Sequence, residues 1–165
     1  GRENKRQKSN AELNLQIDAY LPSDYISDER QKIEIYKRIR EIDSRVNYEN
    51  LQNELIDRFG EYPDVVAYLL EIGLAKSYLD QAFVKSVERQ QNAVIIHFEK
   101  ISQQLYLTQD YFEALSMTNL KARIGEKNGL IEVIFDVRNK KDYEILEGLV
   151  NFGEKMLEIK QRKAE

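Results

Sequence analysis

Apolar positions in this chain follow two different spacings, and each spacing predicts a different kind of element. Between residues 28 and 74 they recur every three or four positions, which is typical of α-helices with one buried face. Over residues 83–98 and 121–137 the pattern changes to short strand-like runs that are separated by polar turns, which indicates β-hairpins. Helical spacing returns after about residue 140. The pattern predicts an α+β fold, in which a helical N-terminal half of three helices packs with a small, largely antiparallel sheet, built from two hairpins, and two further helices.

The first predicted elements are bounded by turn and capping residues. Apolar residues alternate over residues 13–17, which predicts a strand that Pro22 ends. Asp28 and Gln31 have the spacing of a capping box, so a helix is expected to begin there. The residues expected to form the buried stripe of this first helix are Ile33, Ile35, Tyr36, Ile39, Ile42 and Val46.

Two more helices are predicted on either side of a glycine and a proline. The second is expected from about Asn47 to Gly60, because glycine suits the left-handed conformation just past a helix end. Pro63 and Asp64 begin the third, since proline is tolerated in the first turn and an acid suits the positive end of the helix dipole. This third helix is apolar over most of its circumference, so we expect it to be central and the most buried: Val65, Val66, Leu69, Leu70, Ile72 and Leu74.

The C-terminal half predicts two hairpins, with one helix between them and one after them. Asn128 and Gly129 separate two strand-like runs and are typical of a tight hairpin turn. The intervening helix is expected to begin near Thr108, and the last helix to cover about residues 140–160. The expected strands cover residues 83–87, 93–98, 121–126 and 130–137, with a polar turn over 88–92. The expected apolar sides of the two helices are Tyr111, Phe112 and Leu115, and Tyr143, Leu146, Leu149, Val150, Phe152, Met156, Leu157 and Ile159.

Composition restricts the class of protein further. The 165 residues are enough for one domain with its own core, and we expect a flexible lead-in over residues 1–11 and a single domain over 12–165. The chain begins with Gly1, which suggests a piece of a longer protein. It contains no cysteine, no signal-peptide pattern and no apolar run long enough to span a membrane, so the cytoplasm is the expected location.

Side chains that could carry catalysis are few and scattered. The seven glycines form none of the glycine-rich spacings that bind phosphate. His97 is the only histidine and lies mid-strand among apolar residues, so we expect it to be structural or simply exposed. Glu132 and Asp136 would lie roughly 13 Å apart on one strand face, too far for concerted acid–base catalysis. We therefore expect no enzymatic activity, no metal site and no cofactor.

The second predicted helix carries the candidate interaction surface. Glu54 and Asp57 are three residues apart, so they are neighbours on a helix, and they lie opposite its apolar stripe. Asn50, Arg58 and Glu61 flank them. Two interpretations are open from the residues alone. Either Glu54 only forms a surface ion pair with Arg58, or the acidic face meets a partner.

Three segments occur in the order and spacing of one known family. They are Leu21-Pro22-Ser23-Asp24-Tyr25-Ile26, Tyr36-Lys37-Arg38-Ile39, and Glu54-Leu55-Ile56-Asp57-Arg58-Phe59-Gly60 followed by Pro63-Asp64. In these segments the chain resembles the C-terminal (TRCF) domain of bacterial transcription-repair coupling factors (Mfd). The matching segments fall within about residues 13–75. From Phe83 onward only the pattern of elements is similar.

The resemblance implies a function that the residue pattern by itself does not give. Family members are multidomain, ATP-driven DNA translocases that displace stalled RNA polymerase and recruit nucleotide-excision repair through UvrA. Their C-terminal domain is regulatory: it packs on the UvrA-binding module of the same chain, masks that module and restrains the motor. By this resemblance, Glu54 and Asp57 would pair with arginines of the module, and the motor itself would lie outside this chain.

A nucleic-acid-binding accessory role is the alternative. The lead-in is basic, and the first predicted helix carries Lys37, Arg38 and Arg40, which could contact phosphate. However, the net charge of -4 gives no general attraction to DNA or RNA. The aromatic residues fall mostly on helical core stripes rather than on one strand face, where base stacking would need them. We therefore favour the regulatory interpretation.

Overall fold

The computed structural model describes residues 10–165. The predicted lead-in therefore lies mostly outside the described residues. Its last two residues, Asn10 and Ala11, both donate their backbone N–H to the Asp80 carboxylate at 2.9 Å. The elements are β1 (Glu12–Asn14), α1 (Glu29–Arg40), α2 (Arg45–Phe59), α3 (Asp64–Gln81), β2 (Val84–Gln90), β3 (Ala93–Phe98), the 3₁₀ helix η1 (Lys100–Gln104), α4 (Thr108–Leu115), β4 (Lys121–Lys127), β5 (Leu130–Asp136) and α5 (Asp142–Lys163).

The strands form one five-stranded sheet in the order β1-β2-β3-β5-β4. β1 runs parallel to β2, and every other neighbouring pair is antiparallel. The two predicted hairpins, β2–β3 and β4–β5, are thus joined side by side through β3 and β5. Asn128 and Gly129 form the predicted tight turn, both with positive φ. The α+β class and the largely antiparallel sheet are confirmed.

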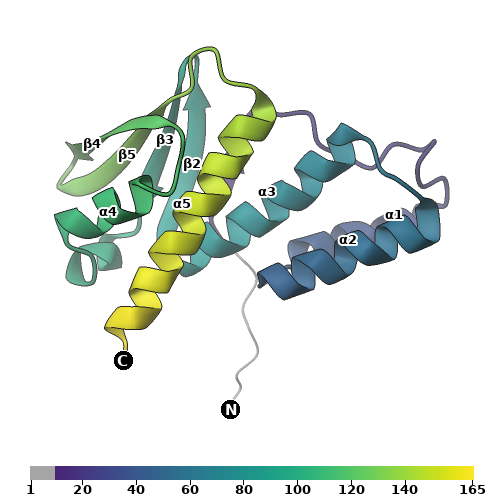
Figure 1. Cartoon of the computed structure of the whole chain (residues 1–165), viewed down its shortest axis with the longest axis horizontal. Helices are drawn as coiled ribbons and strands as arrows, with labels where there is room; N and C mark the ends of the chain where they lie inside the picture. Colours follow the sequence, from purple (N-terminus) through teal and green to yellow (C-terminus); the bar gives the residue numbers. More distant parts are fainter. Residues whose placement is uncertain (1–9) are drawn as a thin grey trace.

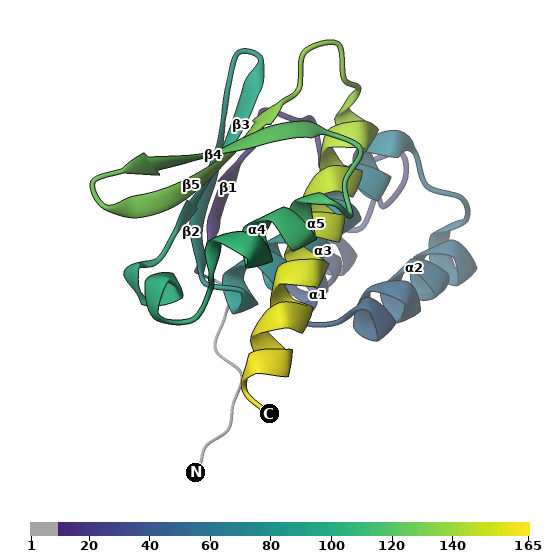
Figure 2. The same cartoon turned by 60° about the vertical axis from the view of Figure 1, so that its left-hand side comes forward.

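The helices pack in two layers beside the sheet (Figures 1 and 2). α3 and α5 lie against each other in the middle layer, and α1 and α2 pack on α3 on the side away from the sheet. The ring of Phe152 in α5 packs edge-on against Phe135 of β5 and Phe98 of β3. The expectation for α3 holds in part: it contacts both the sheet and the other helices, but it shares the central position with α5.

Local sequence signals predicted the N-terminal elements, and the structure corrects where several of these elements begin and end. β1 ends at Asn14 rather than near Pro22, because Gln16 turns into the left-handed region with a φ of 57°. Asp28 caps α1 as predicted, accepting the N–H of Gln31 at 3.0 Å. α1 ends at Arg40, and Ser44 caps a new helix, which moves Val46 into α2, where it is exposed.

The C-terminal half needs similar corrections. β2 continues to Gln90, so the turn shrinks from the five predicted residues to Gln91 and Asn92. Two aromatic residues assigned to helix cores, Phe112 and Tyr143, are more than half exposed, as is Ile33 of α1. A helix on the surface of a domain buries only one stripe, so an apolar residue at the margin of that stripe stays in contact with solvent.

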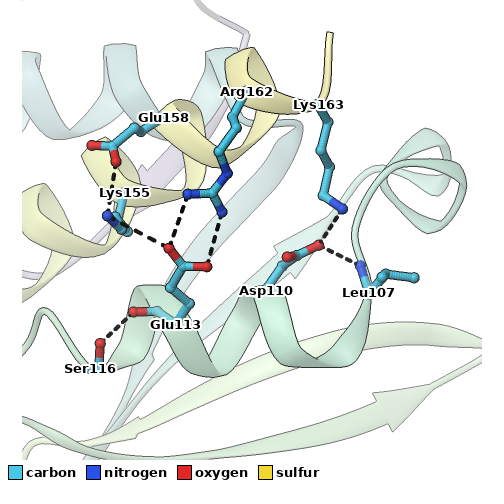
Figure 3. A network of polar contacts seen from close by, with 8 residues as sticks. All are labelled: Leu107, Asp110, Glu113, Ser116, Lys155, Glu158, Arg162 and Lys163. Carbon is cyan, nitrogen blue, oxygen red and sulfur yellow. Dashed lines mark hydrogen bonds and ion pairs between the residues drawn. The ribbon is translucent and has the colours of Figure 1, made fainter. Parts of the chain in front are cut away.

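A network of ion pairs holds the last turns of α5 on α4 (Figure 3). Glu113 of α4 accepts hydrogen bonds from Arg162 at 3.0 and 3.4 Å. The buried Asp110 accepts the backbone N–H of Leu107 at 2.7 Å and lies 3.0 Å from the ammonium of Lys163. Asp110 therefore satisfies the free N–H at the start of α4 and binds the end of α5 with the same carboxylate.

α3 and α5 approach closely at Gly153. A Cβ placed there would lie 3.0 Å from the Tyr78 Cβ and 3.1 Å from the Leu79 Cδ2, both on α3. The Tyr78 Cβ is fixed to the backbone, so the helices themselves would have to separate. Gly148, in the same helix, differs because a Cβ there would lie 2.5 Å from Cδ1 and 3.2 Å from Cγ of Leu120, a side chain that can rotate away without moving a helix backbone.

Alanine substitutions at these two glycines form a matched pair. Both changes add helix propensity of about 1 kcal/mol. Only Gly153→Ala overpacks two helix backbones, so we expect it to unfold more easily than Gly148→Ala by about 1–2 kcal/mol. Urea denaturation followed by circular dichroism measures both. Equal free energies of unfolding would contradict the close approach at Gly153.

Candidate functional site

The outward face of α2 carries the predicted interaction residues. Leu51 and Leu55 are buried against the core, whereas Asn50, Asp57 and Glu61 are exposed to solvent. Gly60 ends the helix with a φ of 85°, as predicted, and its N–H donates to the Ile56 carbonyl at 2.9 Å. The helix therefore turns its acidic side away from the core and ends where the chain turns into α3.

Glu54 lies between two arginines. Its Oε1 is 2.6 Å from Arg38 Nη1 on α1, and its Oε2 is 2.8 Å from Arg58 Nη1 on α2. The other guanidinium nitrogen of Arg58 lies 3.5 Å from Glu34, also on α1. These four side chains, Glu34, Arg38, Glu54 and Arg58, form what we call the α1–α2 ion cluster. The cluster ties the two helices together at their outer surface.

The cluster fixes the charge state of Glu54. Hydrogen bonds from Arg38 and then from Arg58 lower the pKa of the Glu54 carboxyl below its usual range. Its side chain keeps 35% of its exposure, so water weakens each pair. A partner arginine that reached Glu54 would have to share a carboxylate whose two oxygens already have partners.

Asp57 stands in a different environment. It is exposed, and no ion pair joins it to any residue from 10 to 165. Arg58, its neighbour, is turned back toward α1 and lies over the Phe59 ring at 4.9 Å. The structure thus separates the two predicted acids, with Glu54 held inside the domain's own ion cluster and Asp57 open to solvent.

The three segments that carry the family resemblance contact one another. The backbone N–H of Leu21 donates to the Tyr36 hydroxyl at 2.9 Å, which joins the first segment to the second. The Tyr25 hydroxyl donates to the Gly60 carbonyl at 2.8 Å, which joins the first to the third. The pair Arg38–Glu54 joins the second to the third. The contribution of Arg38 was missed from helix periodicity, although its place in the second segment could have indicated it.

The other candidate groups stay apart from this face. His97 lies on β3 with Nε2 3.2 Å from Glu88 and Nδ1 3.3 Å from Glu132, so it joins three neighbouring strands. Over residues 10–165, no group of three or more His, Asp or Glu side chains has the geometry to hold a metal ion. None of the helices in that range combines the length and apolarity needed to cross a membrane.

Comparison with known proteins identifies the family. The TRCF domain model matches residues 15–109, which is more than half of the chain. The chain belongs to the TRCF domain family. The match includes the α1–α2 ion cluster and all three contacting segments.

The relatives extend this likeness to the rest of the chain. The transcription-repair-coupling factor of Bacillus subtilis (strain 168) is 27% identical over 158 residues, 96% of this chain and 13% of the relative. One from Staphylococcus epidermidis is 30% identical over 149 residues, 90% of this chain and 13% of the relative. A crystal structure of the C-terminal domain of transcription-repair coupling factor is 72% identical, with a TM-score of 0.92, and covers 95% of this chain and 98% of that one. This chain therefore spans only a small part of the length of the curated relatives.

Replacing Glu54 by glutamine tests the cluster. Because the folded-state pKa of Glu54 is lowered, its ion pairs add stability at pH values above the ordinary carboxyl pKa of 4.5, and this stability is lost as the pH falls through the folded value. We expect Glu54→Gln to lower the free energy of unfolding by about 0.5–1 kcal/mol at pH 7, and the difference to disappear near pH 2.

Urea denaturation at both pH values measures this effect, with Asp57→Asn as the matched control. Asp57 has no ion pair among residues 10–165, so its neutralisation should leave stability unchanged at either pH. A deficit of Glu54→Gln that persisted unchanged at pH 2 would show that the loss does not come from the charge of Glu54.

Proposed function

We propose that this chain is a non-catalytic autoregulatory domain of a transcription-repair coupling factor. It packs on the UvrA-binding module of the same parent chain, masks that module and restrains the motor. The observation that supports this most is the outward face of α2, where Asp57 is exposed beside a cluster that holds the helix in place. Through the parent, UvrA, RNA polymerase and DNA are indirect partners, and the cytoplasm is the site of action.

The ion cluster gives this face the rigidity that a docking surface needs. The burial of Leu51 and Leu55 turns the acidic side of α2 outward, and the pairs of Arg38 and Glu34 with Glu54 and Arg58 favour this orientation further. A partner arginine then finds Asp57 already exposed and does not have to break an internal ion pair. Glu54 contributes in a second way, because it keeps Arg58 turned away from Asp57. Asn50 and Glu61 lie on the exposed side of the same helix region and can add polar contacts at the rim.

Tethering makes a weak contact sufficient. Two domains of one chain meet at an effective concentration of roughly millimolar, so a contact of only about 10 µM between separate pieces is about 99% closed within the chain. Such a contact masks a binding surface and still opens when a stronger partner competes for it. The affinity between the isolated domain and the isolated UvrA-binding module should accordingly be micromolar or weaker.

The nucleic-acid-binding alternative draws on Lys37, Arg38 and Arg40 of α1. Arg38 is engaged by Glu54 at 2.6 Å, so one of these three cations already has an internal partner. The basic lead-in on which this alternative also relied lies outside the described residues. A phosphate-binding surface gives an affinity for DNA that falls steeply with salt. We expect no DNA binding by this chain at physiological salt.

The decisive experiment is UvrA capture by the full-length parent protein carrying Asp57→Lys. Charge reversal at Asp57 should repel the arginines of the UvrA-binding module, open the contact and increase UvrA capture severalfold. Because Asp57 has no ion pair among the described residues, the domain itself should remain folded. Pull-down of UvrA measures capture, and circular dichroism of the isolated domain checks folding.

Glu126→Lys is the matched control for this experiment. Glu126 is an exposed acid on β4, at the opposite end of the molecule from α2 (Figure 1). Its replacement by lysine changes the net charge by the same amount as Asp57→Lys. It should leave UvrA capture at the wild-type level. If Asp57→Lys also leaves capture unchanged, the α2 face is not the masking surface.

A further inference from the structure

One face of the sheet carries no described element. α3, α4 and α5 lie on the other face (Figure 2), where Val94, Ile96 and Phe98 of β3 are buried beneath them. The open face displays the alternate residues of each strand, and Ile95 and Ile134 at its centre remain partly exposed. This open face lies far from the α2 face, at the opposite end of the molecule (Figure 1).

The open sheet ends in a long edge strand. β4 pairs only with β5 in the described sheet, so one side of its seven-residue backbone has no strand partner. At the opposite edge, β1 has only three residues. The side chains of Ala122 and Ile124 point to the helical face of the sheet but are only partly buried. They lie on an edge strand, so no further strand covers their outer side. A strand added to β4 would pair its backbone and cover these two residues.

Cations outnumber carboxylates beside the first half of β4. Lys121 and Arg123 of β4 and Arg138, just after β5, line an open hollow of about 480 Å³ over Ile134, together with Asp136. Among residues 10–165, none of the three cations forms an ion pair within 4 Å. The Asp136 carboxylate instead accepts the backbone N–H of Arg138 at 3.0 Å. The hollow therefore has three cations against one carboxylate, which leaves it with net positive charge beside the unpaired backbone of β4.

This combination selects the kind of partner. A second copy of the same edge is disfavoured, because it would bring Lys121 and Arg123 against like charges. A single-stranded nucleic acid would use aromatic side chains to stack its bases, but the outward positions of the described strands carry no Phe, Tyr or Trp. An extended peptide needs only backbone pairing, acidic side chains on the open face, and apolar side chains beside Ala122 and Ile124.

We propose that β4 and its basic hollow bind an extended segment of a partner protein, in which acidic and apolar residues alternate, as a sixth strand of the sheet. The alternation follows from the period of a strand. Acidic side chains would lie on the face of Lys121 and Arg123, and the intervening apolar ones would continue the half-covered row of Ala122 and Ile124.

The probe is a fluorescein-labelled peptide of about nine residues, in which glutamate alternates with valine, to match the length of β4. Fluorescence anisotropy with the full chain should show saturable binding. The double variant Lys121→Glu/Arg123→Glu should weaken it at least about tenfold. Lys37→Glu, an exposed charge reversal on α1, is the matched control and should change the affinity less than about twofold.

A second peptide separates strand addition from simple charge attraction. It has the same sequence with alternate backbone amides N-methylated, so it keeps its charge but cannot pair with an edge. Loss of its binding supports the sixth strand, and so does slower hydrogen exchange of β4 amides in the complex with the unmodified peptide. Equal binding of the methylated peptide overturns the proposal. It is also overturned if Lys37→Glu weakens binding as much as the double variant, or if oligothymidine binds this edge more tightly than the peptide.

Discussion

The close packing of α3 on α5 is the constraint on which the other parts of the structure depend. Gly153 lets α5 approach the backbone of α3, and Phe152, the residue before it, faces Phe98 and Phe135 on the sheet. One turn of α5 thus sets both the distance between α5 and α3 and the position of α5 on the sheet. α1 and α2 pack on α3, and Arg45 of α2 also pairs with Glu154 of α5 at 3.0 Å. The position of the α2 face therefore depends on how α3 and α5 pack together.

Polar links then fix what apolar packing leaves adjustable. Apolar burial is not directional, so it leaves a two-helix layer free to slide or rotate by small amounts. The hydroxyls of Tyr25 and Tyr36 and the pair Arg38–Glu54 connect three separate segments at defined atoms. Each bond contributes little free energy where water competes, but their geometry allows one arrangement of α1 on α2. Orientation of the surface, more than stability, is what these polar groups supply.

Local sequence signals predicted which helices and strands form, but they predicted the ends of these elements less accurately. Asp28, Gly60, Pro63 and the Asn128-Gly129 turn act within a few residues, so they could be read directly. Ser44 was missed because the apolar spacing runs on past the true end of α1, and Val46 was then given to the wrong helix. The parallel pairing of β1 with β2 and the contact of Arg38 with Glu54 depend on residues distant in sequence, which no local pattern specifies.

The same limit applies to charge. A net charge of -4 describes a sum, whereas a partner meets one face at a time, because ions separated by more than about 8–10 Å are largely screened in physiological salt. The acidic α2 face and the basic β4 edge lie at opposite ends of the molecule, so neither compensates the other. Composition could therefore argue against a uniformly basic nucleic-acid-binding domain, but it could not reveal a local basic edge. Only the folded arrangement brings Lys121, Arg123 and Arg138 together and leaves Asp57 apart from every cation that could pair with it within the described residues.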